Sequence, residues 1–293
     1  MNYRHAYHAG NHADVLKHAV LALCVERFKT KEKPFRVIDA HAGIARYRLE
    51  SVESQKTEEW RTGLGRLYAD DGAPLPLDEL AEEALAPWRR AVAAENHGGR
   101  LATYPGSPTI AQTLLRAEDR LVVNELHPED VATLGAELGN DARITVMAID
   151  ALSAVKATLP PPERRGIILI DPPYEKNDEA VRAIAALREG AKRFATGTFL
   201  LWYPVTGDGL SDRLVADAVA LKLPKTLDVR LMVRAAVPDG GLAGSGVIVV
   251  NPPWTLTDAL DRLLKPLADR LRQSNECEGG WRWLVPERAG VSG

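Results

Sequence analysis

Apolar runs alternate with amphipathic segments along most of the chain, and this pattern predicts alternating strands and helices. Several of the runs stop abruptly at an acid or a proline, as buried strands of a parallel sheet do where the chain leaves the sheet. Strands are predicted in the segments FRVID, RLVVNELHP, RITVMAID, IILIDPPY, GTFLLWYPV, LDVRLMVRAAV and GVIVVNPPW. Helical spacing of apolar positions predicts helices over residues 131–138, 179–194 and 210–221, with a short helix before the loop PPPERRG.

Two further helices are predicted from their starting residues. Asn11 is a good N-cap, and apolar residues continue at helical spacing from Val15 to Phe28. In the segment YPGSP, Ser107 is expected to be an N-cap, because Pro108 then occupies the first helical position.

Residues 48–100 differ from the rest of the chain. They are strongly charged, carry Trp60, Leu64 and Leu67 at helical spacing, and are broken by the stretches DDGAPLP and NHGG. We therefore expect an inserted helical subdomain, which leaves residues 1–47 and 101–293 to form the main domain.

The order of the elements predicts the fold class. Five strands are joined by helical crossovers, whereas only a Gly-rich loop separates the last two strands, which should therefore pair antiparallel. The expectation is an α/β fold with a doubly wound, Rossmann-like sheet, mostly parallel and with an antiparallel C-terminal edge strand.

Composition and charge narrow the functional classes. The 293 residues include two cysteines far apart, which offer neither a disulfide framework nor a zinc spacing, and no apolar run is long enough to span a bilayer. A cytoplasmic protein without membrane contact is expected. The net charge is −3, yet residues 1–36 carry seven Lys or Arg against three acids. This basic segment either contacts a polyanion locally or is a solvated helix face.

Four successive strands are each followed by a carboxylate, namely Asp39, Glu125, Asp150 and Asp171. In a doubly wound sheet such residues meet at the edge where ligands bind. The small residues of DAHAG allow a close backbone approach, but the segment lacks the GxGxxG pattern of a dinucleotide site. Glu125 is placed to accept from ribose hydroxyls, and Asp150 from an adenine amino group. Together they suit a nucleoside ligand without phosphates.

The segment DPPY supplies the chemistry for an aromatic amine, whose lone pair is delocalised into its ring. Asp171 and the carbonyl of Pro172 are able to accept the two N–H hydrogens of such an amine. The prolines hold both acceptors stiffly, and Tyr174 is able to stack on a base turned out of its helix. The segment NPPW at 251–254 resembles DPPY. It follows the terminal antiparallel strand, however, so its two prolines are expected only to end that strand.

The layout resembles the class I S-adenosylmethionine-dependent methyltransferases. The segments YRHAYHAGNHADVLKH, DAHAG, YPGSP, ELHP, RRGIILIDPPYE and WYPV together resemble the bacterial ribosomal RNA large subunit methyltransferase J family over essentially the whole chain. That family methylates the N6 amine of one adenine in 23S ribosomal RNA. The resemblance implies S-adenosylmethionine as cofactor, 23S ribosomal RNA as partner, no metal, a monomer, and an N-terminal segment that folds over the active site of the methyltransferase domain.

The resemblance also implies roles for individual residues. The expected catalytic residues are Asp171, Pro172 and Tyr174. The expected substrate-binding residues are Tyr3, Arg4, His5 and Tyr174. The expected cofactor-binding residues are Lys17, His18, Asp39, His41, Gly43, Ser107, Glu125, Asp150, Ala151 and Asp171.

Other interpretations stay open from the sequence. One alternative keeps the cofactor and takes a DNA adenine or a protein glutamine amide as acceptor, since similar Pro-Pro motifs serve both. Another is a non-catalytic RNA-binding assembly factor. The histidines near the N-terminus suggest a metal site only weakly, because no Cys accompanies them and none forms HExxH.

Overall fold

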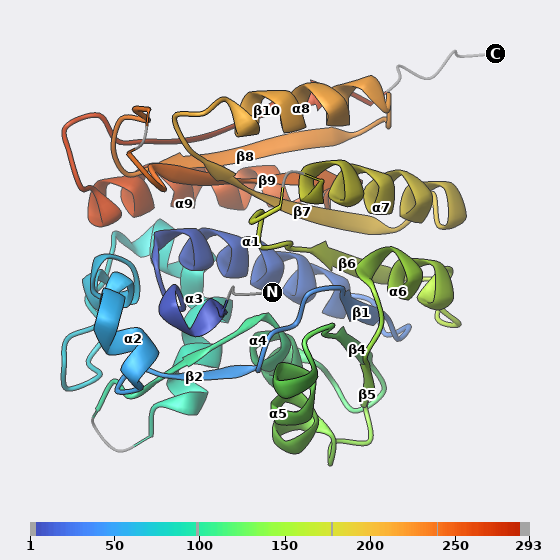
Figure 1. Cartoon of the computed structure of the whole chain (residues 1–293), viewed down its shortest axis with the longest axis horizontal. Coiled ribbons are helices and arrows are strands. Elements are labelled where there is room, and N and C mark those ends of the chain that lie inside the picture. The colour runs from blue at the N-terminus through green and yellow to red at the C-terminus, as the bar shows by residue number, and fades with distance from the viewer. Residues whose placement is uncertain (1–3, 98–99, 177, 239, 288–293) are drawn as a thin grey trace.

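The computed structural model describes residues 4–97, 100–176, 178–238 and 240–287. Its centre is an eight-stranded sheet with the order β10-β8-β9-β7-β6-β1-β4-β5, and a two-stranded sheet pairs β2 with β3 (Figure 1). The strands are β1 (Arg36–Asp39), β2 (Arg46–Arg48), β3 (Thr103–Pro105), β4 (Arg120–Asn124), β5 (Ile144–Met147), β6 (Gly166–Ile170), β7 (Thr198–Val205), β8 (Thr226–Met232), β9 (Gly244–Val250) and β10 (Glu278–Val285).

Helices cover both faces of the large sheet (Figure 1). They are α1 (His12–Lys29), α2 (Val52–Thr57), α3 (Glu79–Glu95), α4 (Ser107–Leu114), α5 (Pro128–Leu138), α6 (Ala151–Thr158), α7 (Glu179–Arg193), α8 (Leu210–Ala220) and α9 (Leu256–Leu271). Three short 3-10 helices occupy His5–Tyr7, Glu59–Thr62 and Leu64–Arg66.

Strand β6 is buried between the helices on the two faces of the sheet. Its five residues are all buried, and alternate side chains enter opposite cores because successive residues of a strand point to opposite faces. Ile167 and Leu169 pack in the core under α1, α4 and α9, whereas Ile168 and Ile170 pack under α6, α7 and α8.

The fold prediction is confirmed. Strands β5, β4, β1, β6 and β7 are parallel, and β8 and β9 form the expected antiparallel pair. The edge strand is β10, antiparallel to β8, a strand that the apolar pattern did not reveal. Within the described residues, no helix is long and apolar enough to cross a membrane.

The starts of two helices test the capping predictions. Asn11 Oδ1 accepts from the N–H groups of Ala13 and Asp14 at 2.9 and 3.0 Å, as predicted. The predicted cap at Ser107 is wrong, because Gly106 is the N-cap and Ser107 is already helical. A side chain at Gly106 would clash, since its Cβ would lie 2.9 Å from the carbonyl oxygen of Ala45.

The ends of segment 48–100 are brought together by the antiparallel pair of β2 and β3, in which Tyr47 lies opposite Tyr104. The segment contains α2, two of the 3-10 helices and α3, and its Trp60, Leu64 and Trp88 belong to the same core as α1. It therefore packs on the main domain through a continuous apolar layer.

Candidate active site

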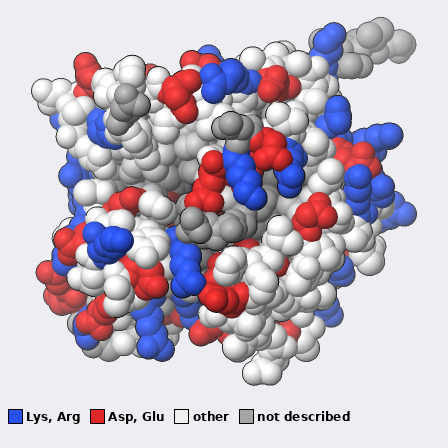
Figure 2. Space-filling view, in the orientation of Figure 1, with Lys and Arg blue, Asp and Glu red and all other residues white. Residues whose placement is uncertain are grey.

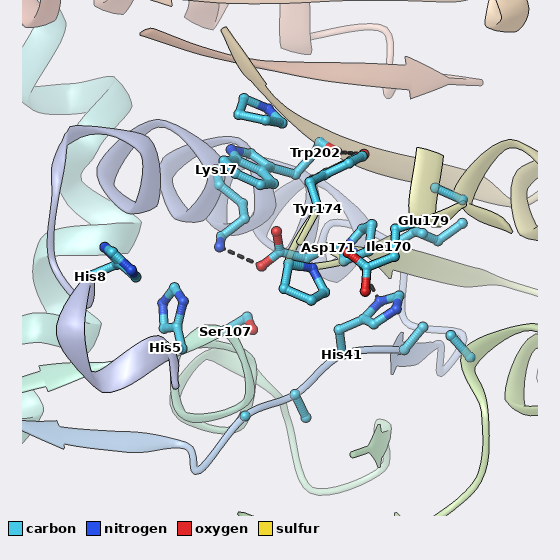
Figure 3. Close-up of a pocket in the computed structure, with 18 of the residues that line it drawn as sticks. His5, His8, Lys17, His41, Ser107, Ile170, Asp171, Tyr174, Glu179 and Trp202 are labelled. Atoms are coloured by element: carbon cyan, nitrogen blue, oxygen red, sulfur yellow. Dashed lines mark hydrogen bonds and ion pairs between the residues drawn. The ribbon is translucent and has the colours of Figure 1, made fainter. Parts of the chain in front are cut away.

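A cavity of about 620 Å³ lies at the carboxyl ends of the parallel strands, between the start of α1 and the loops after β1, β4, β5 and β6 (Figure 3). Of the residues expected at the site, those that line this cavity are His5, Lys17, His18, His41, Gly43, Ser107, Glu125, Asp150, Ala151, Asp171, Pro172 and Tyr174. The topology thus gathers residues from distant parts of the chain at one edge of the sheet.

A buried ion network joins α1 to the end of β6. The side chain of Lys17 points toward Asp171 (Figure 3). Its Nζ lies 2.5 Å from Asp171 Oδ2 and 2.9 Å from Asp14 Oδ1, and the side chain is only 3% exposed. Burial lowers the pKa of Lys17, but the two carboxylates outweigh it and hold that pKa above its ordinary value. Lys17 therefore stays charged and fixes one carboxylate oxygen of Asp171.

His5 extends this network toward solvent. Its Nε2 lies 3.0 Å from Asp14 Oδ2, which also accepts from the N–H of Gly10 at 2.9 Å. Burial raises the pKa of Asp14, but the nearby His5 and Lys17 together outweigh burial. The pKa of Asp14 therefore lies well below its usual range. The start of α1 thus carries a permanently ionised carboxylate beneath the cavity.

His41 is fixed as a neutral donor. Its Nδ1 lies 3.1 Å from the backbone nitrogen of Asp171, which donates to it, so the ring proton resides on Nε2. Burial lowers the pKa of His41 to about 4. Its own backbone N–H donates to Asp39 Oδ1 at 3.2 Å, and burial raises the pKa of Asp39 to about 7.

The carboxylate of Glu125 is held by backbone N–H groups. Its Oε1 accepts from Leu126 and His127 at 2.8 and 2.9 Å, and its Oε2 accepts from Gly43 at 2.9 Å. Oε2 therefore keeps a lone pair for a ligand. Gly43 has φ +60, and a Cβ there would lie 2.1 Å from the hydroxyl of Tyr47, so only glycine fits.

Two further residues of the cavity are held by hydrogen bonds from their neighbours. His18 Nδ1 lies 2.8 Å from the hydroxyl of Tyr104, and burial lowers the pKa of His18 to about 3, so its ring is neutral. Asp150 caps α6 by accepting from the N–H of Ser153 with Oδ1 at 3.0 Å, and hydrogen bonds from the side chain and the backbone of Ser153 hold the pKa of Asp150 below its ordinary value.

Tyr174 adopts the left-handed backbone region with φ +54, which is unusual for a bulky residue. Its hydroxyl donates to the carbonyl oxygen of Trp202 at 2.6 Å, and the two rings are tilted with centroids 5.7 Å apart. The tyrosine is thus held against β7 beside Asp171, a strained conformation of the kind found at functional sites.

Some expected residues do not reach the cavity. Arg4 donates to Glu129 Oε2 at 2.7 Å on the surface, and Tyr3 lies outside the described residues. Asp39 is buried behind the cavity wall and contributes through His41. No group of metal-binding side chains is found within the described residues.

The repeat NPPW lies at the opposite edge of the sheet. Val250, which precedes it, pairs with Phe199 near the start of β7. Asn251 Nδ2 donates to the carbonyl oxygens of Ala195 and Gly197 at 2.8 and 2.9 Å. Asn251 therefore holds the turn before β7 in place, which is the structural role expected for this motif.

Several residues of the site were missed by sequence reasoning. Asp14 was identifiable in principle, because its spacing from Lys17 is that of an i,i+3 pair. Glu59 was not, because it comes from segment 48–100 and reaches the cavity only through folding, where its oxygens lie 2.9 Å from His8 Nδ1 and Asn11 Nδ2. Asn124, whose amide joins the loops after β1 and β5, carried no signal either.

Comparisons with known proteins point in one direction. Residues 32–285 match the family described as "Ribosomal RNA large subunit methyltransferase D, RlmJ". The Haemophilus influenzae protein named "Ribosomal RNA large subunit methyltransferase J" is 44% identical over 98% of this chain and 100% of its own length. The Escherichia coli protein of the same name is 41% identical over 98% and 100%. A crystal structure of a Legionella pneumophila protein matches with a TM-score of 0.82 and 29% identity, covering 94% of this chain and 97% of that one.

Proposed function

The chain belongs to the RlmJ family of ribosomal RNA large subunit methyltransferases, and we propose that its cavity binds S-adenosylmethionine and methylates the N6 amine of an adenine in 23S ribosomal RNA. It is therefore a methyltransferase with an α/β fold. Its cofactor, its acceptor and the roles of its residues are what we propose.

The observation that carries the proposal is the arrangement around Asp171. Lys17 occupies Oδ2 of this carboxylate, so Oδ1 is left to accept an N–H hydrogen, and the Pro172 that follows it lines the same cavity. Two acceptors in fixed positions suit an exocyclic amine, which has two hydrogens to donate. Their hydrogen bonds draw the nitrogen toward a tetrahedral shape and free its lone pair, and the contact with Lys17 holds the carboxylate of Asp171 in position.

The residues present fit S-adenosylmethionine. Glu125 Oε2 has a lone pair for a ribose hydroxyl, His41 presents Nε2–H, and Gly43 lines the cavity beside Glu125. Asp150 lines the cavity at the start of α6, where its carboxylate is placed to accept from the adenine amino group. When bound, this cofactor supplies a methyl group on a sulfonium, which needs no metal for transfer.

Tyr174 supports a flipped adenine as the acceptor. An adenine inside an RNA helix exposes its amine poorly, so it must turn out of the stack into a pocket with an aromatic wall. Tyr174, Trp202 and His5 line the cavity around Asp171 (Figure 3). We propose that Tyr174 stacks on this base and that His5, with the N-terminal segment, closes the opposite side.

The test is methylation of defined acceptors with labelled S-adenosylmethionine. We expect label in 23S ribosomal RNA as N6-methyladenine, and mass spectrometry should find that nucleotide missing from RNA of cells that lack the protein. Label in DNA or in protein amides, but not in 23S ribosomal RNA, would overturn the acceptor. Failure to bind S-adenosylmethionine in isothermal titration would favour a non-catalytic RNA-binding role.

A further inference from the structure

An exposed tryptophan lies among cations at the edge of the sheet opposite the cavity. We propose that this surface, formed by Arg27, Lys31, Lys33, Arg165 and Trp254 and called here the Trp254 surface, binds the substrate RNA outside the active site. An unpaired base would stack on Trp254, and neighbouring phosphates would contact the lysines. The inference rests on the proposed function, because it takes the RNA substrate as given.

Trp254 is the best candidate for a base platform. It is 73% exposed, more than any other tryptophan among the described residues, and it follows two prolines that fix the chain. The guanidinium carbon of Arg27 lies 5.0 Å from the centroid of its ring. A cation on one face holds the indole in place and leaves the other face for a base, an arrangement typical of single-stranded RNA sites.

The lysines project from a loop that is unusually well fixed. Arg116 donates to the carbonyl oxygen of Lys31 at 2.9 Å and to that of Lys33 at 3.5 Å. Arg165 donates to the carbonyl oxygens of Lys33 and of Phe28, the latter at 2.8 Å. Three of these bonds hold the loop backbone and the fourth holds the last turn of α1, so the exposed lysine side chains extend from a backbone that is already ordered.

These cations form no ion pairs in the part of the chain that the structure describes. Within the described residues, no carboxylate oxygen lies within 4 Å of a charged nitrogen of Arg27, Lys31, Lys33 or Arg165. The neighbouring acids are already engaged: Glu26 pairs with Lys29 and Arg90, Asp119 with Arg116, and Glu163 with Arg36. Glu32 is the exposed acid within the loop itself.

The helix dipole does not explain this surface. Lysines and arginines also gather where α6 and α7 end, along the right-hand edge in Figure 2, and there Lys156, Lys192 and Arg193 lie in last helical turns. Such cations are favoured by the partial negative charge of a helix C-terminus. In the Trp254 surface Arg27 also lies in a last helical turn, that of α1, but Lys31 and Lys33 lie beyond the end of this helix, so the dipole does not account for the surface as a whole.

The position of the surface suits a long substrate. Lys17 and Arg27 lie on the same helix, α1, separated by about 15 Å at 1.5 Å per residue. The cavity itself is lined by many carboxylates, including Asp14, Glu59 and Asp208, which repel a phosphate backbone. A large ribosomal RNA therefore needs cationic contacts elsewhere, and the Trp254 surface offers unpaired cations together with an aromatic platform.

Binding of labelled 23S ribosomal RNA fragments to the full chain, titrated at several salt concentrations without cofactor, tests the proposal. Trp254→Ala should weaken binding about fivefold or more, since stacking is worth about 1–3 kcal/mol per base. The double variant Lys31→Ala/Lys33→Ala should reduce the magnitude of the salt slope by about 1–2, because two phosphate contacts are lost. The matched controls Trp283→Ala and Arg262→Ala/Lys265→Ala, exposed on β10 and α9, should behave as wild type.

Activity separates this surface from the catalytic site. The variants of the Trp254 surface should raise the KM for the long RNA and leave kcat unchanged. Wild-type affinity in Trp254→Ala, or a wild-type salt slope in the lysine double variant, would overturn the proposal and leave the surface to a protein partner. A wild-type enzyme that binds the RNA with the expected salt slope but does not methylate it would instead overturn the proposed function alone.

Discussion

Each carboxylate that follows a parallel strand has different partners, and these decide what it is still able to accept. Asp171 has one oxygen on Lys17, and Glu125 has three backbone N–H donors. Asp150 caps a helix, and Asp39 is buried with its pKa raised to about 7. The sequence showed four acids at one edge of the sheet. It could not show this division of roles, because the partners come from other segments.

Replacement of Asp171 tests its role at the amine. Asp171→Ala should lower kcat by about 100-fold or more, because it removes an acceptor used mainly in the transition state. Affinity for S-adenosylmethionine should stay within a few-fold. Asp171→Asn keeps an acceptor oxygen and should be more active than Asp171→Ala. A fully active alanine variant, or one that loses the cofactor in isothermal titration, would contradict the assignment.

Asn251→Ala is the control from the repeated motif. Its amide donates to two carbonyl oxygens and its φ is +50, so the variant should lose about 1–3 kcal/mol of unfolding free energy. Activity per folded molecule should be normal. The comparison separates chemistry from stability when unfolding and methylation are measured on the same samples.

Glu125→Ala should weaken S-adenosylmethionine and its demethylated product equally, since both carry the same ribose. A lost hydrogen bond to a charged group costs about 1.5–3 kcal/mol, or about 10- to 150-fold in Kd. Isothermal titration with both ligands measures this, and Glu129→Gln, a neighbouring exposed acid, is the control. Unchanged affinity in Glu125→Ala would place the ribose partner elsewhere.

At the scale of elements, most of the sheet was predictable because its strands are short apolar runs that end in turn residues. Strand β10 was not, because its sequence EGGWRWLV has two glycines after its first residue and none of its residues is fully buried. The structure explains the first of them: a Cβ at Gly279 would lie 2.4 Å from the carbonyl oxygen of Leu264 on α9. The close packing of α9 against β10 thus requires a glycine, and glycine is a residue with low β-propensity.

Segment 48–100 remains a proposed subdomain, and its arginines test whether it contacts RNA. Arg89 pairs with Glu82 at 2.7 Å, Arg90 with Glu26 at 2.7 Å, and Arg100 with Glu50. Because all three cations are already neutralised, replacing them together with glutamine should leave both cofactor affinity and the salt slope of RNA binding unchanged. A flatter slope, measured beside the Lys31→Ala/Lys33→Ala variant, would place an RNA contact on this segment.

At the scale of the whole molecule, the fold keeps three histidines neutral near the start of α1 and the cavity. Burial lowers the pKa of His12 to about 4, that of His18 to about 3 and that of His41 to about 4. The unfolded chain binds these protons near pH 6.5, so protonation there favours unfolding. Asp39 acts in the opposite sense, because its raised pKa makes the folded state bind a proton up to about pH 7.

The balance predicts how stability depends on pH. Between pH 6.5 and 4 the unfolded state binds up to three histidine protons that the folded state excludes. The folded state gains an extra proton on Asp39, and also binds the proton of His8 more tightly because the hydrogen bond with Glu59 raises the pKa of His8. Unfolding free energy should therefore fall as the pH is lowered, by about 1–3 kcal/mol from pH 6.5 to 5.5. Urea unfolding at several pH values measures this slope. His12→Gln removes one of the three groups and should flatten the slope, whereas a stability that stays constant or rises toward pH 5.5 would show that these rings are already charged in the folded protein.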